Sequence, residues 1–152
     1  MADNVDQSIR DQVLNLVPQQ SPFRFINKII ELSDEHIVGQ YTFLQDEFFY
    51  KGHFLGNPIT PGVILIETMA QTGVVALGIY LTLKAGGDLS QLTVFTDGQV
   101  DFANMVKPGE TVTVHAEKIF WRRGKLKSRI ELRKADGSLA ANGELSGMGV
   151  KV

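Results

Sequence analysis

Two ionisable side chains in one stretch of the chain are of types that can move protons. His53 follows Gly52 and lies between aromatic residues, Tyr50 and Phe54, while Glu67 follows fourteen positions later among apolar residues. Desolvation keeps an imidazole neutral and able to act as a base, and it lets a carboxyl group keep its proton and act as an acid. A loop histidine alone is more often a hydrogen-bonded structural residue. The pair predicts general acid–base chemistry.

Gly62 and Gln71 add two further functions to this stretch. Pro61-Gly62 is a typical helix start, and the first N–H groups of a helix lack an intrahelical partner. Because Gly62 has no side chain, a carbonyl oxygen can approach its N–H, which would stabilise an enolate. Gln71 lies one turn after Glu67 on the same face and can hydrogen-bond its carboxyl group. Together these groups suit β-elimination of water from a 3-hydroxyacyl thioester.

Glu67 belongs to a long apolar segment, VILIETMAQTGVVALGIYLTL at residues 63–83. The segment is long enough to span a bilayer, but an acid at mid-membrane depth is unfavourable, and no basic residues flank it. A helix that is apolar on nearly every face must be enclosed by other elements. We therefore expect a buried core helix and no membrane span. The alternative for Glu67, a position at an exposed edge of this helix, is disfavoured by its apolar neighbours.

The rest of the chain is mainly strand. A short amphipathic helix is predicted at residues 8–16, with Val13, Leu14 and Leu16 facing inward. Alternating or β-rich runs predict strands at residues 23–32, 37–43, 92–105, 111–121, 126–133 and 139–146. Residues 107–110, Lys-Pro-Gly-Glu, predict a tight reversal between two of these strands.

This order of elements predicts a single α+β domain over residues 1–152. Runs of strands around one segregated helix are typical of an antiparallel sheet. We expect a curved sheet of about five to six strands wrapped around one long apolar central helix.

The composition excludes several classes of protein. The net charge of −2 gives no field to attract nucleic acid, and the absence of cysteine excludes disulfides, thiolate metal sites and cysteine nucleophiles. The polar N-terminus does not resemble a signal peptide, so a cytoplasmic location is expected.

A longer pattern resembles a known family. Residues 45–71, QDEFFYKGHFLGNPITPGVILIETMAQ, resemble the signature N-E-P-F-F-x-G-H-F-P-G-x-P-I-M-P-G-V-L-x-x-E-A-M-A-Q of the 3-hydroxyacyl-[acyl-carrier-protein] dehydratases of the hot-dog superfamily. Weaker similarity extends to residues 17–23 and 102–110.

The resemblance implies a role for each site residue. His53 would take the α-proton, Glu67 of the partner subunit would protonate the leaving hydroxyl, the Gly62 N–H would bind the thioester carbonyl, and Gln71 would orient the carboxyl group. The acyl pocket is expected among Phe48, Phe54, Val74 and Leu77.

The resemblance also implies partners. The expected assembly is a homodimer with two shared sites, or a trimer of such dimers. The substrate would be a phosphopantetheine thioester on an acyl carrier protein, with no cofactor and no metal. Relatives that also isomerise the double bond typically have Asp at the acid position, so Glu67 favours plain dehydration.

The sequence departs from the family pattern at three places. Gln19 replaces a histidine, Leu55 replaces a proline, and residues 101–106 lack the arginines that help to recruit the carrier protein. The protein would serve fatty-acid synthesis or a specialised acyl or polyene pathway, and the altered basic segment favours the second. A cationic hairpin with Arg122, Arg123 and Lys125 could supply the missing carrier contact; an ordinary solvated turn is the alternative.

Two other functions remain open at this point. A hot-dog thioesterase positions an attacking water with Asp or Glu and does not need this His–Glu pair. A non-catalytic acyl-thioester-binding protein could keep the fold, although intact His53 and Glu67 argue against lost activity.

Overall fold

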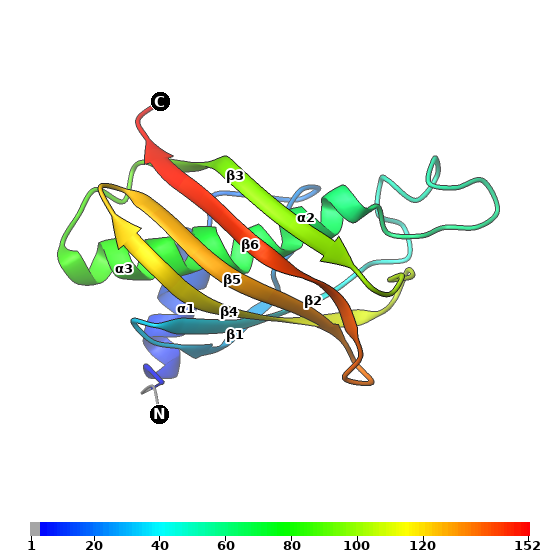
Figure 1. The fold of residues 1–152 in the computed structure, drawn as a ribbon, viewed down its shortest axis with the longest axis horizontal. Helices are drawn as coiled ribbons and strands as arrows, with labels where there is room; N and C mark the ends of the chain where they lie inside the picture. The colour runs from blue at the N-terminus through cyan, green and yellow to red at the C-terminus, as the bar shows by residue number, and fades with distance from the viewer. Residues whose placement is uncertain (1–3) are drawn as a thin grey trace.

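A six-stranded antiparallel sheet curves around one central helix (Figure 1). The computed structural model describes residues 4–152, so residues 1–3 of the expected domain lie outside it. The elements are α1 (Gln7–Leu16), β1 (Lys28–Leu32), β2 (His36–Thr42), α2 (Gly62–Ala70), η1 (Gln71–Ala76), α3 (Leu77–Ala85), β3 (Leu92–Phe102), β4 (Thr111–Arg122), β5 (Lys125–Lys134) and β6 (Leu139–Val150). The expected α+β class and curved sheet are confirmed.

The central helix is continuous from α2 through η1 to α3. It begins after Pro61 and ends at Gly86, whose φ of 70° places it in the left-handed region that favours glycine. By length and composition it could cross a membrane, but 67% of its most apolar window is buried inside the fold. It is therefore the core helix that the sequence predicts. Its middle turn, Gln71–Ala76, is a π-helix, which the sequence pattern did not indicate.

The π-helical turn packs closely on the concave face of the sheet. A Cβ atom on Gly73 would come within 2.5 Å of Ile130 Cδ1 and 3.0 Å of Ala116 Cβ. The Ser128 hydroxyl donates a hydrogen bond of 2.7 Å to the Gly73 carbonyl oxygen. This contact fixes the helix on the sheet, and with it the direction in which Glu67 points.

The strand order corrects one prediction. The order is β1-β2-β4-β5-β6-β3, so β3 pairs with β6, whereas β4 lies between β2 and β5. The turn at residues 107–110 does form, with Gly109 at φ 86°, but it does not join paired strands. Its Gly109 N–H donates to the Phe43 carbonyl, which attaches the turn to the end of β2. As a result β3 is a long edge strand with most of its residues exposed.

The first helix is close to its predicted position. Asp6 caps it by accepting a hydrogen bond of 3.1 Å from the Ile9 N–H. Val13 is fully buried and Leu14 packs against the core, as predicted. Leu16 is 38% exposed, and the prediction for it was wrong because Val17, one turn after Val13, takes the inner position.

Candidate active site

The segment between β2 and α2, which includes His53, is held at both ends by buried side-chain hydrogen bonds. The Glu47 carboxylate accepts from the Tyr41 hydroxyl at 2.5 Å and from the Leu44 N–H at 3.1 Å. The Tyr50 and Thr60 hydroxyls are 2.6 Å apart. Burial raises the pKa of Tyr50 to about 12, so this phenol remains a neutral hydrogen-bonding group near pH 7. The chain around His53 is thus anchored before and after the histidine.

The His53 ring is fixed through one of its two nitrogens. Its Nδ1 lies 2.8 Å from the Ile59 carbonyl oxygen, and its face stacks on Phe54 with ring centroids 4.0 Å apart. Because a carbonyl oxygen can only accept, Nδ1 must carry the proton of the neutral ring. The lone pair of the neutral ring therefore lies on Nε2. This is the tautomer that a general base needs.

The Glu67 carboxyl group is hydrogen-bonded to Gln71, whose side-chain amide is in turn fixed by two backbone groups. Gln71 Nε2 donates to Glu67 Oε1 at 3.0 Å, the contact that the spacing predicts. The Gln71 amide also donates to the Phe23 carbonyl at 2.9 Å and accepts from the Phe25 N–H at 2.6 Å. Burial raises the pKa of Glu67, and the weaker effect of the Gln71 hydrogen bond opposes it. The carboxyl group therefore keeps its proton to higher pH than an exposed glutamate.

Gly62 begins the central helix with an open N–H group. Within residues 4–152 this N–H donates to no backbone or side-chain acceptor. The Phe102 ring covers it closely, since a Cβ atom on Gly62 would lie 3.1 Å from Phe102 Cζ. The Thr60 N–H donates to the Val106 carbonyl at 2.8 Å, which positions the chain just before the helix. The site thus offers one N–H donor beside an aromatic ring.

A single chain does not bring His53 and Glu67 together. Glu67 lines a pocket of about 40 Å³ between the central helix and β3, with Gln19, Val74 and Phe95 among the other lining residues. None of the pocket's lining residues comes from the loop that contains His53. No hydrogen bond joins His53 to Glu67 within residues 4–152. His53 and Glu67 thus lie in separate surroundings on one protomer.

The four residues expected to form the acyl pocket lie in different places. Val74 lines the pocket beside Glu67, whereas Leu77 is fully buried in the core. Phe48 and Phe54 are each 52% exposed in the loop. The sequence did not lead us to assign Gln19 to the site. The replacement of the family's histidine by Gln19 was the signal that could have indicated it.

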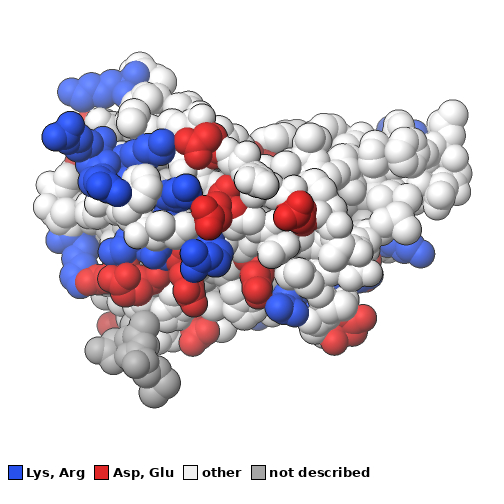
Figure 2. Space-filling model, viewed as in Figure 1, with Lys and Arg blue, Asp and Glu red and all other residues white. Residues whose placement is uncertain are grey.

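The β4–β5 hairpin lies at one end of the molecule, where Lys and Arg side chains gather, and the start of α2 lies toward the other end (Figures 1 and 2). Lys125 pairs with Met148, and Met148 pairs in turn with Val94, near the start of β3. Phe102, whose ring covers Gly62, is the last residue of β3. Within the hairpin, Lys125 forms an ion pair of 3.0 Å with Asp97, and the Arg122 guanidinium lies 4.3 Å from the centre of the Phe120 ring.

A curved sheet wrapped around one helix, with an acid on that helix near its N-terminus, defines the class as a hot-dog protein. The solved dehydratase heterocomplex ApeI:P of Xenorhabdus doucetiae has this fold, with a TM-score of 0.78 at 18% identity over 91% of both chains. A hypothetical thioesterase of Streptococcus pneumoniae, solved with coenzyme A, is also similar, with a TM-score of 0.59 at 12% identity over 81% of this chain and 84% of its own.

Sequence comparison then gives the family. The chain belongs to the FabA-like domain family, whose model matches residues 17–145. It is 36% identical over 136 residues to the 3-hydroxyacyl-[acyl-carrier-protein] dehydratase FabZ of Acetivibrio thermocellus, covering 88% of this chain and 89% of the relative. It is also 36% identical to the FabZ protein of Chloroflexus aggregans over 137 residues, covering 88% and 90%.

Proposed function

We propose that this protein dehydrates (3R)-3-hydroxyacyl thioesters on an acyl carrier protein to trans-2-enoyl thioesters. The observation that carries the proposal is the fixed His53 tautomer, with Nδ1 bound to the Ile59 carbonyl and Nε2 available as a base. The raised pKa of Glu67 supplies the matching acid. The similarity to FabZ proteins over most of the chain supports the same reaction.

The reaction needs only the groups described. His53 Nε2 removes a proton from C2 of the thioester, and the Gly62 N–H stabilises negative charge on the carbonyl oxygen. The electron pair of the broken C–H bond then forms the C2–C3 double bond while the C3–O bond breaks. Glu67 gives its proton to the departing hydroxyl, which leaves as water. Gln71 orients the carboxyl group, and a proton returns from His53 to Glu67 by way of water. Relatives that also isomerise the double bond typically have Asp where this chain has Glu67, so we expect plain dehydration.

The edge strand β3 supports a shared site in a homodimer. A long uncovered edge strand is available for pairing with another chain, and β3 exposes the apolar residues Leu92, Val94 and Phe95. If two β3 strands pair antiparallel about a two-fold axis near their middle, the Phe102 end of one lies beside the start of the other. Gly62 and His53 of one protomer would then approach the partner's Thr93–Phe95 segment, which lines the Glu67 pocket. Such dimers could also assemble as trimers of dimers.

The same two-fold arrangement gives the cationic hairpin a role. The hairpin lies at the start of β3, so it would flank the end of the partner where Gly62 lies. Arg122 and Arg123 form no ion pair within residues 4–152 and are exposed. They suit the phosphate of phosphopantetheine or an acidic carrier protein. We place the enzyme in the cytoplasm and assign it to fatty-acid synthesis or to a specialised acyl pathway.

The reaction is tested by following a 3-hydroxyacyl thioester for enoyl absorbance and for free thiol separately. Dehydration predicts enoyl product without thiol release, whereas thiol release alone would identify a thioesterase. Mixing His53→Ala with Glu67→Gln protomers tests the shared site. Heterodimers of these variants retain one intact site, so activity should return to about a quarter of the wild-type value. If mixing restores nothing while subunits exchange, the shared site is wrong.

The carrier contact is tested separately. Arg122→Ala and Arg123→Ala should weaken turnover of the acyl-carrier substrate while sparing small thioester analogues. Lys125→Ala should have less effect, because Lys125 is already paired with Asp97. Equal losses on both substrates would contradict this role.

A further inference from the structure

The pocket beside Glu67 is lined by a residue with an unsatisfied hydrogen-bond acceptor. Gln19 lines this pocket, and its Oε1 atom is buried from solvent and has no hydrogen-bond donor within residues 4–152. Two other buried side-chain atoms in this range also lack a partner, Arg10 Nε and Ser146 Oγ, but neither residue lines the pocket. Buried polar atoms in native proteins are nearly always paired, so an exception beside a reacting group points to a contact with a ligand.

The chain around Gln19 is fixed by an arginine of the same loop. Arg24 Nη1 donates to the Val17 carbonyl at 3.0 Å and to the Gln19 carbonyl at 3.1 Å. Its Nη2 donates to the Leu14 carbonyl at 2.7 Å, which ties the loop to the end of α1. The following residues of the loop supply the two backbone groups that hold the Gln71 amide. One loop therefore positions both Gln19 and the residue that orients the proposed acid.

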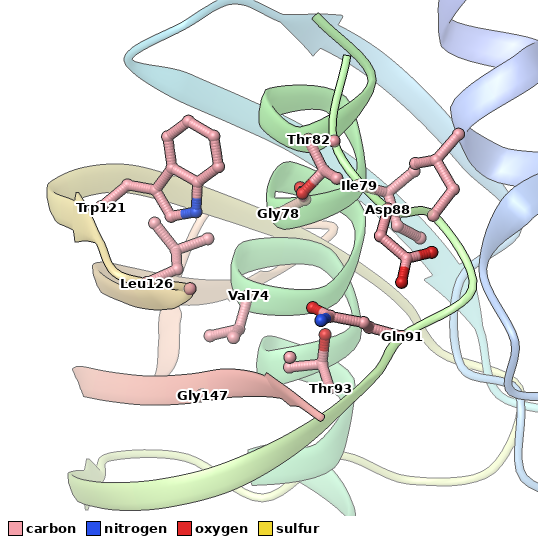
Figure 3. Close-up of a pocket in the computed structure, with 14 residues that line it drawn as sticks. Val74, Gly78, Ile79, Thr82, Asp88, Gln91, Thr93, Trp121, Leu126 and Gly147 are labelled. Carbon is pink, nitrogen blue, oxygen red and sulfur yellow. The ribbon is translucent and has the colours of Figure 1, made fainter. Parts of the chain in front are cut away.

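This pocket is small. Its volume is about 40 Å³, and about 10–15 Å³ is enough for one water molecule. On one side Val74 and Thr93 lie beside Gly147 (Figure 3), and a Cβ atom on Gly147 would come within 2.7 Å of Val74 Cγ1 and 2.8 Å of Thr93 Cγ2. These packed side chains separate the pocket from a larger cavity of about 230 Å³, which Gly78 and Trp121 help to line. The smaller pocket therefore suits a group of the size of a hydroxyl or a water molecule.

The C3 hydroxyl group of the proposed substrate brings the missing donor. During elimination its oxygen takes the Glu67 proton with a lone pair, so its own hydrogen must point elsewhere. An amide oxygen can only accept, and Gln19 Oε1 can therefore receive this hydrogen. Glu67 and Gln19 line the same small pocket, so one hydroxyl group can contact both. Such a contact turns a lone pair of the hydroxyl oxygen toward the carboxyl proton.

We propose that Gln19 is a further catalytic residue, whose Oε1 accepts a hydrogen bond from the C3 hydroxyl group of the substrate. The inference rests on the proposed function, because it places the leaving group in the pocket beside Glu67. As Glu67 transfers its proton, the C3–O bond breaks and the hydroxyl leaves as water, while Gln19 exchanges no proton. A donor that gains positive charge forms a stronger hydrogen bond, so the contact strengthens as the departing oxygen is protonated. Gln19 therefore lowers the barrier to the loss of water.

The first test compares two N-acetylcysteamine thioesters, 3-hydroxybutyryl and butyryl, which differ only in the C3 hydroxyl group. Gln19→Met keeps a side chain of similar length but removes the acceptor. For dehydration of the 3-hydroxybutyryl compound kcat/KM should fall by about 10- to 100-fold, whereas the inhibition constant of the butyryl compound should not change. The control Gln12→Met, at an exposed position on α1, should leave both values unchanged. An unchanged kcat/KM in Gln19→Met, or an equal loss in the binding of the butyryl compound, would overturn the proposal.

Thermal unfolding separates this role from a structural one. Because Gln19 Oε1 has no donor within residues 4–152, an apolar side chain of similar shape removes an unsatisfied group and breaks no hydrogen bond of that oxygen. The Tm of Gln19→Met protein should therefore equal that of the wild type or exceed it, by up to about 4 °C. A lower Tm together with lower activity would show that Gln19 serves the fold, and would overturn the proposal.

A replacement that keeps an acceptor gives a third measurement. Gln19→His introduces an imidazole, the group that the family has at this position, and its unprotonated nitrogen can accept a hydrogen bond. This variant should recover part of the activity that Gln19→Met loses. Equal losses in the two folded variants would contradict the role of residue 19 as an acceptor.

The pH–rate profile shows whether Gln19 contacts the substrate or Glu67. If Gln19 contacts the substrate, the Glu67-dependent limb of the kcat/KM profile should lie at the same pH in Gln19→Met protein as in the wild type. A move of this limb to lower pH would show that Gln19 accepts a hydrogen bond from the protonated carboxyl group instead, and would overturn the proposal.

The wild-type protein in the same assay separates this inference from the proposed reaction. If the wild type forms no enoyl product, the proposed function fails and the role of Gln19 fails with it. If the wild type dehydrates the 3-hydroxybutyryl compound and Gln19→Met does so equally well, only the role of Gln19 is overturned. Enoyl formation by the wild type with a selective loss in Gln19→Met supports both.

Discussion

The two ends of the central helix differ in how their polar groups are held. At the N-terminal end His53 and Glu67, the residues that we propose to react, each have one polar atom fixed by the protein and another left open. His53 is bound through Nδ1 and Glu67 through Oε1, while His53 Nε2 and the Gly62 N–H have no partner within residues 4–152. At the other end Trp121 and Gln91 line a cavity, Trp121 half-buried and Gln91 exposed.

This difference bears on the chemistry that we propose for the N-terminal end. Proton transfer depends on the direction of a lone pair, so a half-satisfied residue held by its neighbour is preorganised for it.

Replacement of the base should give the largest effect. His53→Ala removes the only Nε2 lone pair that we assign to C2, and kcat should fall by about 10²–10⁴-fold. Enoyl absorbance with a 3-hydroxybutyryl thioester measures this loss. His115→Ala is the matched control, since His115 is an exposed histidine on β4. Comparable activity of His53→Ala and wild type would exclude His53 as the base.

The fold was largely predictable from the sequence because its signals are local. Period-2 alternation marked the strands, and Pro61 and Gly86 marked the ends of the central helix. The order of strands in the sheet was not predictable in the same way. Residues 107–110 form a turn whether or not the strands beside it pair, so local turn chemistry could not show that β3 lies next to β6.

The site was predictable where spacing along a helix decides the contact. Gln71 follows Glu67 by one turn, and the hydrogen bond between them is present. The contacts of Gln71 with Phe23 and Phe25 join segments distant in sequence, and no periodicity indicates them. The cavity at Gly78 also depends on residues from the helix, β4 and β6 together.

Removal of Gln71 should have the next largest effect. Gln71→Leu leaves the Phe25 N–H and the Phe23 carbonyl without their side-chain partner, so the free energy of unfolding should fall by about 1–3 kcal/mol. Because the Gln71 hydrogen bond lowers the pKa of Glu67, its loss should also move the Glu67-dependent limb of the pH–rate profile upward. Urea unfolding and a kcat profile against pH measure the two effects. Gln40→Leu is a control, since Gln40 is half-buried on β2, away from Glu67. A pH profile unchanged in Gln71→Leu would exclude its contact with the reacting carboxyl group.

Glu67 should make stability depend on pH in a direction opposite to that of most carboxylates. Burial raises the pKa of Glu67 above its ordinary value of 4.5, so the native protein binds this proton more tightly than the unfolded chain. Its contribution is fully present below pH 4.5 and is lost as pH rises through the native pKa, with a slope of at most about 1.4 kcal/mol per pH unit. Wild-type stability relative to Glu67→Gln should therefore decrease across this window. Exposed Glu117 provides the control, because Glu117→Gln should show no such decrease. A wild-type advantage that grows with pH would mean that Glu67 is stabilised as a carboxylate.

The smallest effect should come from the cavity end of the helix. Gly78→Ala adds a methyl group with an ordinary contact to Leu126 and removes a flexible helix residue, so stability should rise by about 0.5–1 kcal/mol. Gly73→Ala makes the same change five residues earlier, where the new atom would meet Ile130 and Ala116, and it should destabilise the protein. Thermal unfolding of the two variants compares the positions directly. Destabilisation by Gly78→Ala equal to that by Gly73→Ala would show that the helix packs as tightly beside the cavity as on the sheet.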